Sequence, residues 1–318
     1  MKKTLTLVAM ALALSTNAFA WPDKTITLVV PFPAGGATDA LARTLTPKLQ
    51  EKLKQNVIVD NKAGATGTIG AGFVKRAPAD GYTLLVTSLG PLVIAPYLLA
   101  KVPYEASKDF DYLTVAVQAP NVLVVPASSP YKTMAELIAA EKANPGKLTF
   151  ASAGTGTSDH LSAELFWLQS GTSGLHVPYK GAAPAITDLL GGQVDAAFQN
   201  INNVLPHITA GKLRVLAIAA PKRSPLLPSV PTLTESGVKD ADATSWQGVV
   251  APKGLPPAVK AQIHAALMDA LADPAVKQKF AEVGFEMVAN TPEQFAAYQA
   301  SEAARWKKLI ETRKIAVD

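Results

Sequence analysis

Residues 26–39 read ITLVVPFPAGGATD, an apolar run that passes through two glycines into a helical pattern. Residues 148–158, LTFASAGTGTS, repeat this arrangement about 120 positions later. A strand that turns through glycines into a helix leaves backbone N–H groups free, and the helix dipole adds partial positive charge there. Two such turns, at 33–39 (turn 1) and 154–158 (turn 2), predict a cleft between two lobes that binds an anionic small molecule.

The N-terminus has the pattern of a secretory signal peptide. Lys2 and Lys3 precede an apolar stretch at 5–14, and residues 18–20, AFA, form a small-x-small cleavage site. The stretch is shorter than the roughly 20 residues that span a bilayer, so a retained membrane anchor is the less favoured alternative. We predict cleavage after Ala20 and a periplasmic mature chain, in which removal of 20 of 318 residues leaves 298.

Composition limits the classes of partner and cofactor. The sequence has no cysteine, which excludes a lipoprotein anchor and a disulfide framework. The formal charge of +5 becomes +3 once the two signal-peptide lysines are removed, and the remaining basic residues are scattered. We therefore expect no nucleic-acid partner.

Short β-rich runs alternate with longer helical ones, which predicts an α/β fold with mostly parallel sheets, and the length favours two domains. Residues 119–121, APN, are a plausible crossing point between the lobes, and the Pro- and Ser-rich residues 221–237 are expected to form an ordered excursion. Strands are expected at 26–30, 57–61, 83–87, 113–118, 122–125, 148–151, 175–178, 196–198, 215–219 and 247–251, and helices at 38–52, 67–75, 133–144, 158–170, 182–190, 203–210, 256–271, 274–283 and 291–313.

Catalytic signatures are missing from the sequence. It contains no cysteine nucleophile, no Gly-x-Ser-x-Gly elbow and no Gly-x-x-x-x-Gly-Lys-Ser/Thr loop. The four histidines are far apart along the chain and form no His-Glu-x-x-His pair. The glycines at 64, 67, 70 and 72 have the wrong order of spacings for a dinucleotide loop. We expect no catalytic residue, no metal and no cofactor.

Each turn offers candidate ligand contacts beside a purely structural alternative. In turn 1, Gly35 and Gly36 permit close backbone approach. Thr38 caps the helix or contacts the ligand, and Asp39 complements the helix dipole or contacts the ligand. The turn 2 candidates are Thr155, Gly156, Thr157 and Ser158, whose hydroxyls and N–H groups make a natural carboxylate cradle or a plain N-cap, and His160, a packing residue or a contact.

An ordered set of motifs runs over nearly the whole mature chain. It resembles the signature of the Bug family, the receptors of tripartite tricarboxylate transporters. The motifs are VPFPAGGATD at 30–39, GTGTSDHL at 154–161, VPYKG at 177–181, LGGQVD at 190–195, GKLR at 211–214, VPTLTESG at 230–237, and Trp246.

The resemblance implies a two-lobed fold of the periplasmic-binding-protein type, in which each lobe is a mainly parallel sheet flanked by helices and crossing strands join the lobes. Lobe 1 is expected at 21–122 and 247–318, and lobe 2 at 123–246. The resemblance also implies that backbone amides of both turns hold one carboxylate, at Phe32, Ala34, Gly35, Gly36, Ala37 and Thr38 and at Thr155, Gly156, Thr157 and Ser158. The family often has an aspartate near Asn200, which is therefore a polar contact or a structural turn residue.

Four further candidates rest on position or residue type. Ser88 and Phe198 are at the ends of expected strands, where open α/β sheets bind ligands. The phenol of Tyr179 is able to reach the cleft or simply packs with its hydroxyl at the surface. Phe32 covers an apolar part of the ligand or plugs the rim of the cleft.

The function expected from these features is capture of a small organic carboxylate, which the resemblance implies is delivered to a tripartite tricarboxylate permease. Two alternatives stay open. One is a sensory role, in which the loaded protein docks on a membrane sensor kinase. The other is a secreted hydrolase or isomerase that uses His160 with Asp159 or Ser158, although such near neighbours on one helical turn are not evidently aligned as nucleophile and base.

Overall fold

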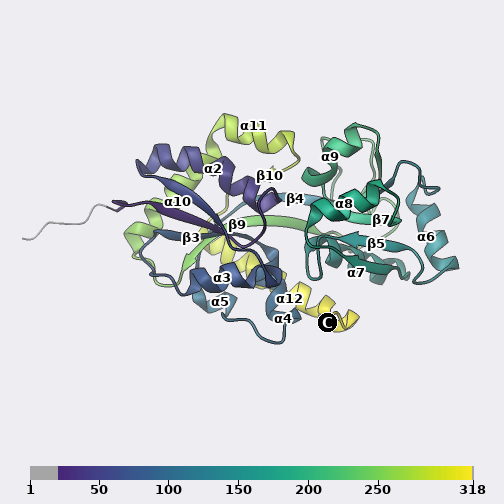
Figure 1. Cartoon of the computed structure of the whole chain (residues 1–318), viewed down its shortest axis with the longest axis horizontal. Coiled ribbons are helices and arrows are strands. Elements are labelled where there is room, and N and C mark those ends of the chain that lie inside the picture. Colours follow the sequence, from purple (N-terminus) through teal and green to yellow (C-terminus); the bar gives the residue numbers. More distant parts are fainter. Residues whose placement is uncertain (1–20, 317–318) are drawn as a thin grey trace, which may run out of the picture.

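The computed structural model describes residues 21–316, which form two α/β lobes joined by two long strands (Figure 1). The strands that run through the middle are β4 (Phe110–Pro126) and β9 (Thr244–Pro252). The predicted two-lobed α/β architecture is thereby confirmed. The predicted signal peptide, residues 1–20, lies outside the described residues. None of the helices within 21–316 is long and apolar enough to cross a membrane.

The first lobe is drawn in purple, blue and yellow-green in Figure 1, and the second in teal and green. The first contains β1 (Ile26–Val30), β2 (Val57–Asn61), β3 (Thr83–Ser88), β10 (Glu286–Met287), α2 (Ala37–Leu53), η2 (Ala65–Gly67), α3 (Thr68–Lys75), the π-helix η3 (Gly90–Ile94), α4 (Ala95–Leu98), α5 (Ala106–Asp109), α10 (Pro257–Ala272), α11 (Pro274–Glu282) and α12 (Pro292–Arg313). The second contains α6 (Met134–Ala143), β5 (Thr149–Ser152), α7 (Ser158–Ser170), β6 (Leu175–Pro178), α8 (Ala182–Leu190), β7 (Ala196–Asn200), α9 (Ile201–Thr209) and β8 (Leu213–Ala219).

Strand direction and register bring two sets of strand ends to one place. Within the first lobe β1 pairs in parallel with β2 and β3, and within the second β5 pairs in parallel with β6 and β7. The end of β3 meets β4 through β9, because Ser88 pairs with Gln247 and Gln247 with Val117. The end of β7 meets β4 directly, because Asn200 pairs with Asn121. The carboxyl ends of both parallel sets therefore converge on the middle of β4.

The expectation of two separate strands at 113–118 and 122–125 is wrong, because β4 continues through 119–121 as one strand of 17 residues. At this point the partner of β4 changes from β9, at Pro120, to β7 and β8, at Asn121. Pro120 has no N–H to donate, yet it pairs with Thr244 of β9 and does not interrupt the strand. The segment 90–98, for which the sequence predicts no helix or strand, forms η3 and α4. By contrast, β1, β2, β6, α7 and α8 have the predicted bounds.

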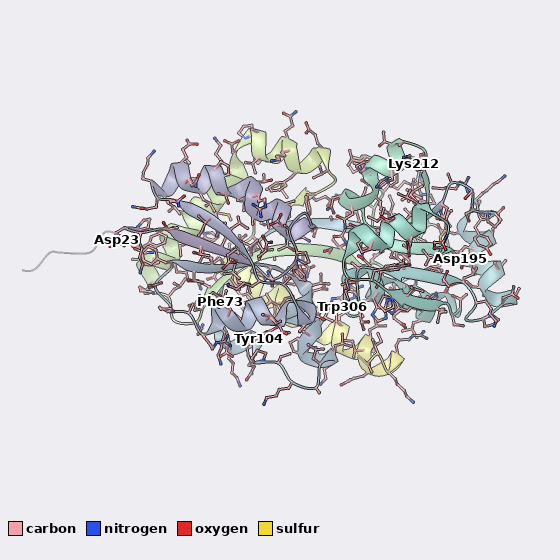
Figure 2. All side chains as sticks on the ribbon, in the orientation of Figure 1. Asp23, Phe73, Tyr104, Asp195, Lys212 and Trp306 are labelled. Atoms are coloured by element: carbon pink, nitrogen blue, oxygen red, sulfur yellow. The ribbon has the colours of Figure 1, made fainter. Side chains whose placement is uncertain are left out.

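The C-terminal helix α12 packs its apolar face against η3 and β4. Its start has the predicted capping box, since Thr291 Oγ1 accepts from the Gln294 N–H and Gln294 Oε1 accepts from the Thr291 N–H. Trp306, labelled in Figure 2, and Phe295 are both fully buried. Phe295 also packs edge-on against Trp246 of β9, so the last helix fixes the crossing strands from behind.

Gly248 of β9 tests this packing. An added Cβ would lie 2.8 Å from Phe295 Cζ and 2.8 Å from the Thr114 carbonyl oxygen. We expect Gly248→Ala to lower the unfolding free energy by about 1–3 kcal/mol, the usual cost of overpacking, in urea titrations followed by circular dichroism. The matched control is Gly191→Ala, where the nearest atom would be 3.5 Å away. Equal losses in both variants would contradict the packing argument.

Candidate functional site

A cleft with a volume of about 1190 Å³ lies between the lobes. Its walls are mainly the segments that follow the parallel strands, as strand polarity requires. The lining comprises residues 31–38 after β1, 63–67 after β2, 88–90 after β3, 153–159 after β5 and 180–184 after β6, with Asn200 at the end of β7, Ser245 and Gln247 on β9, and further residues of α2, α8, α9 and the segment 283–285.

Turn 1 presents the open N-terminus of α2 to the cleft. As in any helix, the N–H groups of the first residues, Ala37 and Thr38, have no helical partner. The N-cap residue, Gly36, has no side chain that could accept from them instead. Gly35 has φ +87°, a conformation that favours glycine. Gly36 has φ −83°, and a Cβ there would meet no atom closer than 3.8 Å. Only Gly35 therefore needs to be glycine for backbone reasons.

Asp39 holds turn 1 from behind. One carboxylate oxygen accepts from the Gly35 N–H and from Arg43 Nε, both at 2.9 Å, and the other accepts from Asn61 Nδ2 at 3.0 Å. Burial opposes ionisation of Asp39, but these hydrogen bonds outweigh it and lower its pKa. Asn61 Nδ2 also donates to the Phe32 carbonyl oxygen at 3.0 Å. The acid therefore locks the glycine turn to β2.

Turn 2 presents the N-terminus of α7. The N-cap is Thr157, whose hydroxyl accepts from the His160 N–H at 3.5 Å. The N–H groups of Ser158 and Asp159 stand in the first turn of the helix and have no helical partner. Gly156 has φ +77°, and a Cβ there would lie 2.3 Å from Leu98 Cδ2 of the first lobe. Turn 2 thus packs against the opposite lobe as well as facing the cleft.

A pair of stacked histidines supports turn 2. The rings of His160 and His176 are 3.8 Å apart and nearly parallel. His160 Nδ1 accepts from the Gly156 N–H at 3.1 Å, and His176 Nε2 is 2.7 Å from Ser152 Oγ. Burial, together with the neighbouring His160, lowers the pKa of His176 to about 3, so His176 stays neutral.

An ion pair connects this support to the last helix. Glu164 Oε1 is 3.6 Å from His160 Nε2, and Glu164 Oε2 accepts from Arg313 Nε at 2.7 Å. Burial disfavours the charge on Glu164, but these partners outweigh it and lower its pKa. The end of α12 therefore contacts the helix that carries turn 2.

A buried polar cluster forms the floor beside turn 2. Burial raises the pKa of Asp159 to about 6, although the Ala153 N–H and Ser158 Oγ bond its carboxylate. Asn200 Nδ2 lies within hydrogen-bond distance of Asn121 Oδ1, Ser158 Oγ and Asp159 Oδ1. The floor thus joins β4, β7 and α7 through side chains.

The structure brings most of the predicted site residues together in the cleft lining. Those in the lining are Phe32, Ala34, Gly35, Gly36, Ala37, Thr38, Ser88, Thr155, Gly156, Thr157, Ser158 and Asn200. Four lie outside it: Asp39 and His160 support the turns, the Tyr179 hydroxyl donates to Asp188 Oδ2 at 2.7 Å, and Phe198 is fully buried against Phe166. Phe198 lies two residues before the end of β7 and packs in the core, whereas Asn200 is the last residue of the strand and reaches the cleft.

Sequence reasoning missed several lining residues. The segment 63–67 was considered only as a dinucleotide loop, although the end of β2 in a parallel sheet points to the same edge as β1. Lys180 and His207 enter the cleft from lobe 2, and Gln247 enters from β9, where its Nε2 donates to Ser245 Oγ at 3.0 Å. Only three-dimensional packing places these residues.

The geometry does not align the enzyme candidates. The hydroxyl of Ser158 donates to Asp159, and His160 Nδ1 is occupied by the Gly156 N–H. His160 Nε2 faces Glu164. Within residues 21–316 no group of three or more acidic, histidine or cysteine side chains is placed to hold a metal ion. The described side chains thus build a binding cleft with polar turns.

Comparison with known proteins gives a consistent family. Residues 41–315 match the sequence profile of the tripartite tricarboxylate transporter family receptor. A protein encoded in the tcbD–tcbE intergenic region of Pseudomonas sp. strain P51 is 41% identical, with 96% of this chain and 92% of that protein covered. BugT of Bordetella pertussis is 39% identical, with 94% and 92% covered. The expected resemblance to Bug proteins is confirmed.

Solved structures agree with this result. An R. palustris protein with adipate has a TM-score of 0.88 and 35% identity, with 93% of this chain and 99% of that chain covered. MatC from Rhodopseudomonas palustris with bound malate has a TM-score of 0.85 and 32% identity, with 91% and 100% covered. The periplasmic binding protein BugD has a TM-score of 0.86 and 36% identity, with 93% of this chain and 99% of that chain covered, so the fold is that of periplasmic binding proteins.

The neutral state of His176 makes a testable contribution to stability. A histidine in the unfolded chain gains a proton below pH about 6.5, whereas folded His176 resists protonation down to pH about 3. The unfolded state therefore binds more protons between these values, and stability falls as the pH falls through them. We expect the stability difference between wild type and His176→Phe to shrink by up to about 2 kcal/mol from pH 7 to pH 5. Urea titrations at both pH values measure it, and a constant difference would contradict it.

Proposed function

The chain belongs to the tripartite tricarboxylate transporter receptor family, and we propose that it captures a small organic carboxylate in the interlobe cleft. The observation that carries the proposal is the convergence of two helix N-termini, at Ala37 and Ser158, on one cavity. Each supplies backbone N–H groups without a helical partner. Hydrogen bonds from fixed N–H groups to an ionised carboxylate are short and strong.

The charges of the cleft favour an anion held chiefly by backbone. Three ionisable side chains appear in the described lining, namely Asp159, Lys180 and His207. Asp159 is bonded within the floor, whereas Lys180 and His207 line the cleft from the second lobe. Since the fixed donors lose little conformational freedom on binding, they favour tight capture. Similar proteins carry adipate and malate in their solved structures, which supports an acid as ligand.

We also propose that the two lobes close around the ligand. Lobe 1 would comprise 21–122 and 247–318, and lobe 2 would comprise 123–246, so that β4 and β9 are the hinge strands. Several contacts already cross between them, among them Gly156 near Leu98 and the ion pair of Arg313 with Glu164. Such closure excludes water from the carboxylate and strengthens its hydrogen bonds.

The wider role follows from the family. We propose that residues 1–20 are a cleaved signal peptide, that the mature protein acts in the periplasm, and that it delivers its ligand to a membrane permease of the tripartite tricarboxylate type. It performs no bond chemistry in this proposal. Docking of the loaded form on a sensor kinase is the second candidate, because the same closed form would serve both partners.

Ligand binding by the purified protein tests the central proposal. Mature protein that has been unfolded and refolded, to remove any co-purified ligand, is titrated with a panel of mono-, di- and tricarboxylates. A ligand at 100 times its dissociation constant stabilises by about 2.7 kcal/mol, which should raise the unfolding midpoint by roughly 5–10 °C. Refolded protein that responds to no acid would remove the basis for carboxylate capture.

A proline at the first position of α2 tests the backbone donors directly. Ala37→Pro deletes one N–H from turn 1, and helices accept proline at this position. Gly36 already has ψ 173°, which suits a residue before proline. We expect carboxylate affinity to fall about 10- to 100-fold in calorimetric titrations, because a hydrogen bond to a charged group contributes roughly 1.5–3 kcal/mol.

The matched control is Ala37→Gly, which keeps the N–H and should bind within a few-fold of wild type. Thermal unfolding of both variants without ligand separates a binding defect from a folding defect. An unchanged affinity in a folded Ala37→Pro protein would show that turn 1 does not hold the carboxylate.

A further inference from the structure

Asn200 occupies an unusual place in the cleft floor. It ends β7, begins α9, lines the cleft and is only 5% exposed. Its side chain does not cap α9. Its Nδ2 instead points at the cluster around Asn121 and Ser158. The amide is therefore held by the interior on one side and faces the cleft on the other.

A chain of hydrogen bonds fixes which end of this amide faces the cleft. The chain starts at the Ser158 carbonyl oxygen, which accepts from Ser162 Oγ at 2.7 Å. Because the Ser162 hydroxyl has given its hydrogen away, it accepts from Asn121 Nδ2, also at 2.7 Å. Asn121 therefore offers its Oδ1 to Asn200, and only Asn200 Nδ2 is able to donate to it. A backbone carbonyl thus sets the orientation of Asn200.

Asn200 Oδ1 is consequently an acceptor without a donor. None of the side-chain hydrogen bonds found within residues 21–316 reaches it, whereas its Nδ2 has three neighbouring acceptors. The oxygen is also absent from the fully buried polar atoms that lack a partner, so it is open to the cleft. An acceptor in a largely buried site calls for a donor from whatever fills the cleft.

The position of Asn200 relates this acceptor to the carboxylate. Its Nδ2 lies 3.2 Å from Ser158 Oγ, and Ser158 is the first residue of α7, whose N–H belongs to the proposed carboxylate cradle. The amide that carries the acceptor therefore lies next to the proposed carboxylate cradle.

We propose that Asn200 Oδ1 selects acids that carry a hydroxyl group close to the carboxylate held by the two turns. The ligand class is then a hydroxycarboxylate, and the inference rests on the proposed carboxylate-binding function. An ammonium group is disfavoured there, because the N-termini of α7 and α9 both add partial positive charge. The nearby Asp159 carboxylate lies on the Nδ2 side of the Asn200 amide and already accepts from the Ala153 N–H and Ser158 Oγ. A ligand without a donor leaves the buried acceptor unpaired or bridged by water.

Matched pairs of acids test this inference. Wild-type mature protein is titrated calorimetrically with malate and succinate, lactate and propionate, and 3-hydroxybutyrate and butyrate. For the pairs that bind, we expect the hydroxy acid to bind at least about tenfold more tightly, a difference of about 1.4 kcal/mol. Aspartate is included beside malate, and aspartate should bind more weakly.

Variants assign the preference to Asn200. Asn200→Ala should bring the affinity ratio within each pair close to one. Asn144→Ala, an exposed asparagine at the end of α6, should keep the wild-type ratio. The wild-type ratios test the ligand class even if Asn200→Ala does not fold.

The outcomes distinguish failure of the hydroxyl inference from failure of the proposed carboxylate-binding function. Wild-type protein that binds acids but does not distinguish the members of each pair overturns the hydroxyl inference and leaves carboxylate capture standing. The hydroxyl inference is also overturned if folded Asn200→Ala still prefers the hydroxy acids, or if wild-type protein binds aspartate more tightly than malate. Carboxylate capture stands in both cases. Protein that binds no acid in either series overturns both.

Discussion

The pairing of β4 along its whole length is the constraint on which the rest of the structure depends. Its first half pairs with β9 and its second half with β7 and β8, so one strand belongs to both lobes. This register brings Ser88, through Gln247, to Val117 of β4, and it brings Asn200 to Asn121, four positions further along β4. Ser88 and Asn200 each end a parallel strand whose companions run the same way. The loops at all six carboxyl ends therefore face one cavity, and the cleft is a consequence of strand direction.

Glycine turns alone would not make a binding site, because a turn that leaves N–H groups free is also free to move. Each turn here is fixed by a side chain one helical turn further on. Asp39 bonds the Gly35 N–H, and His160 bonds the Gly156 N–H. Both bonds join residue i + 4 of the helix to the turn that precedes it. Asp39 and His160 each accept one N–H of the turn and hold the remaining N–H groups in place. This role explains why these two residues of the motifs lie outside the cavity lining.

The local sequence predicted those elements whose positions depend on neighbouring residues in the chain. Apolar runs located β1, β2 and β6, and the threonine–proline–glutamine pattern located the start of α12. The two turns were found for the same reason, since glycine, threonine and serine signal free N–H groups. The expectation of separate strands on either side of 119–121 failed because a proline such as Pro120 usually ends a strand, whereas here it pairs with Thr244. Phe198, Lys180, His207 and Gln247 depend on register or on packing between lobes, which no local pattern encodes.

The floor of the cleft shows how hydrogen-bond direction limits recognition. An asparagine offers both a donor and an acceptor, so its presence alone does not say which group a ligand meets. Here the Ser158 carbonyl oxygen accepts from Ser162, Ser162 from Asn121, and Asn121 from Asn200. Each hydrogen bond fixes the direction of the next one, because a hydroxyl has a single hydrogen to donate and an amide has a donor end and an acceptor end. In the proposed complex, the start of α7 supplies N–H donors for the carboxylate, and its Ser158 carbonyl oxygen fixes the orientation of the acceptor that meets the neighbouring group of the ligand.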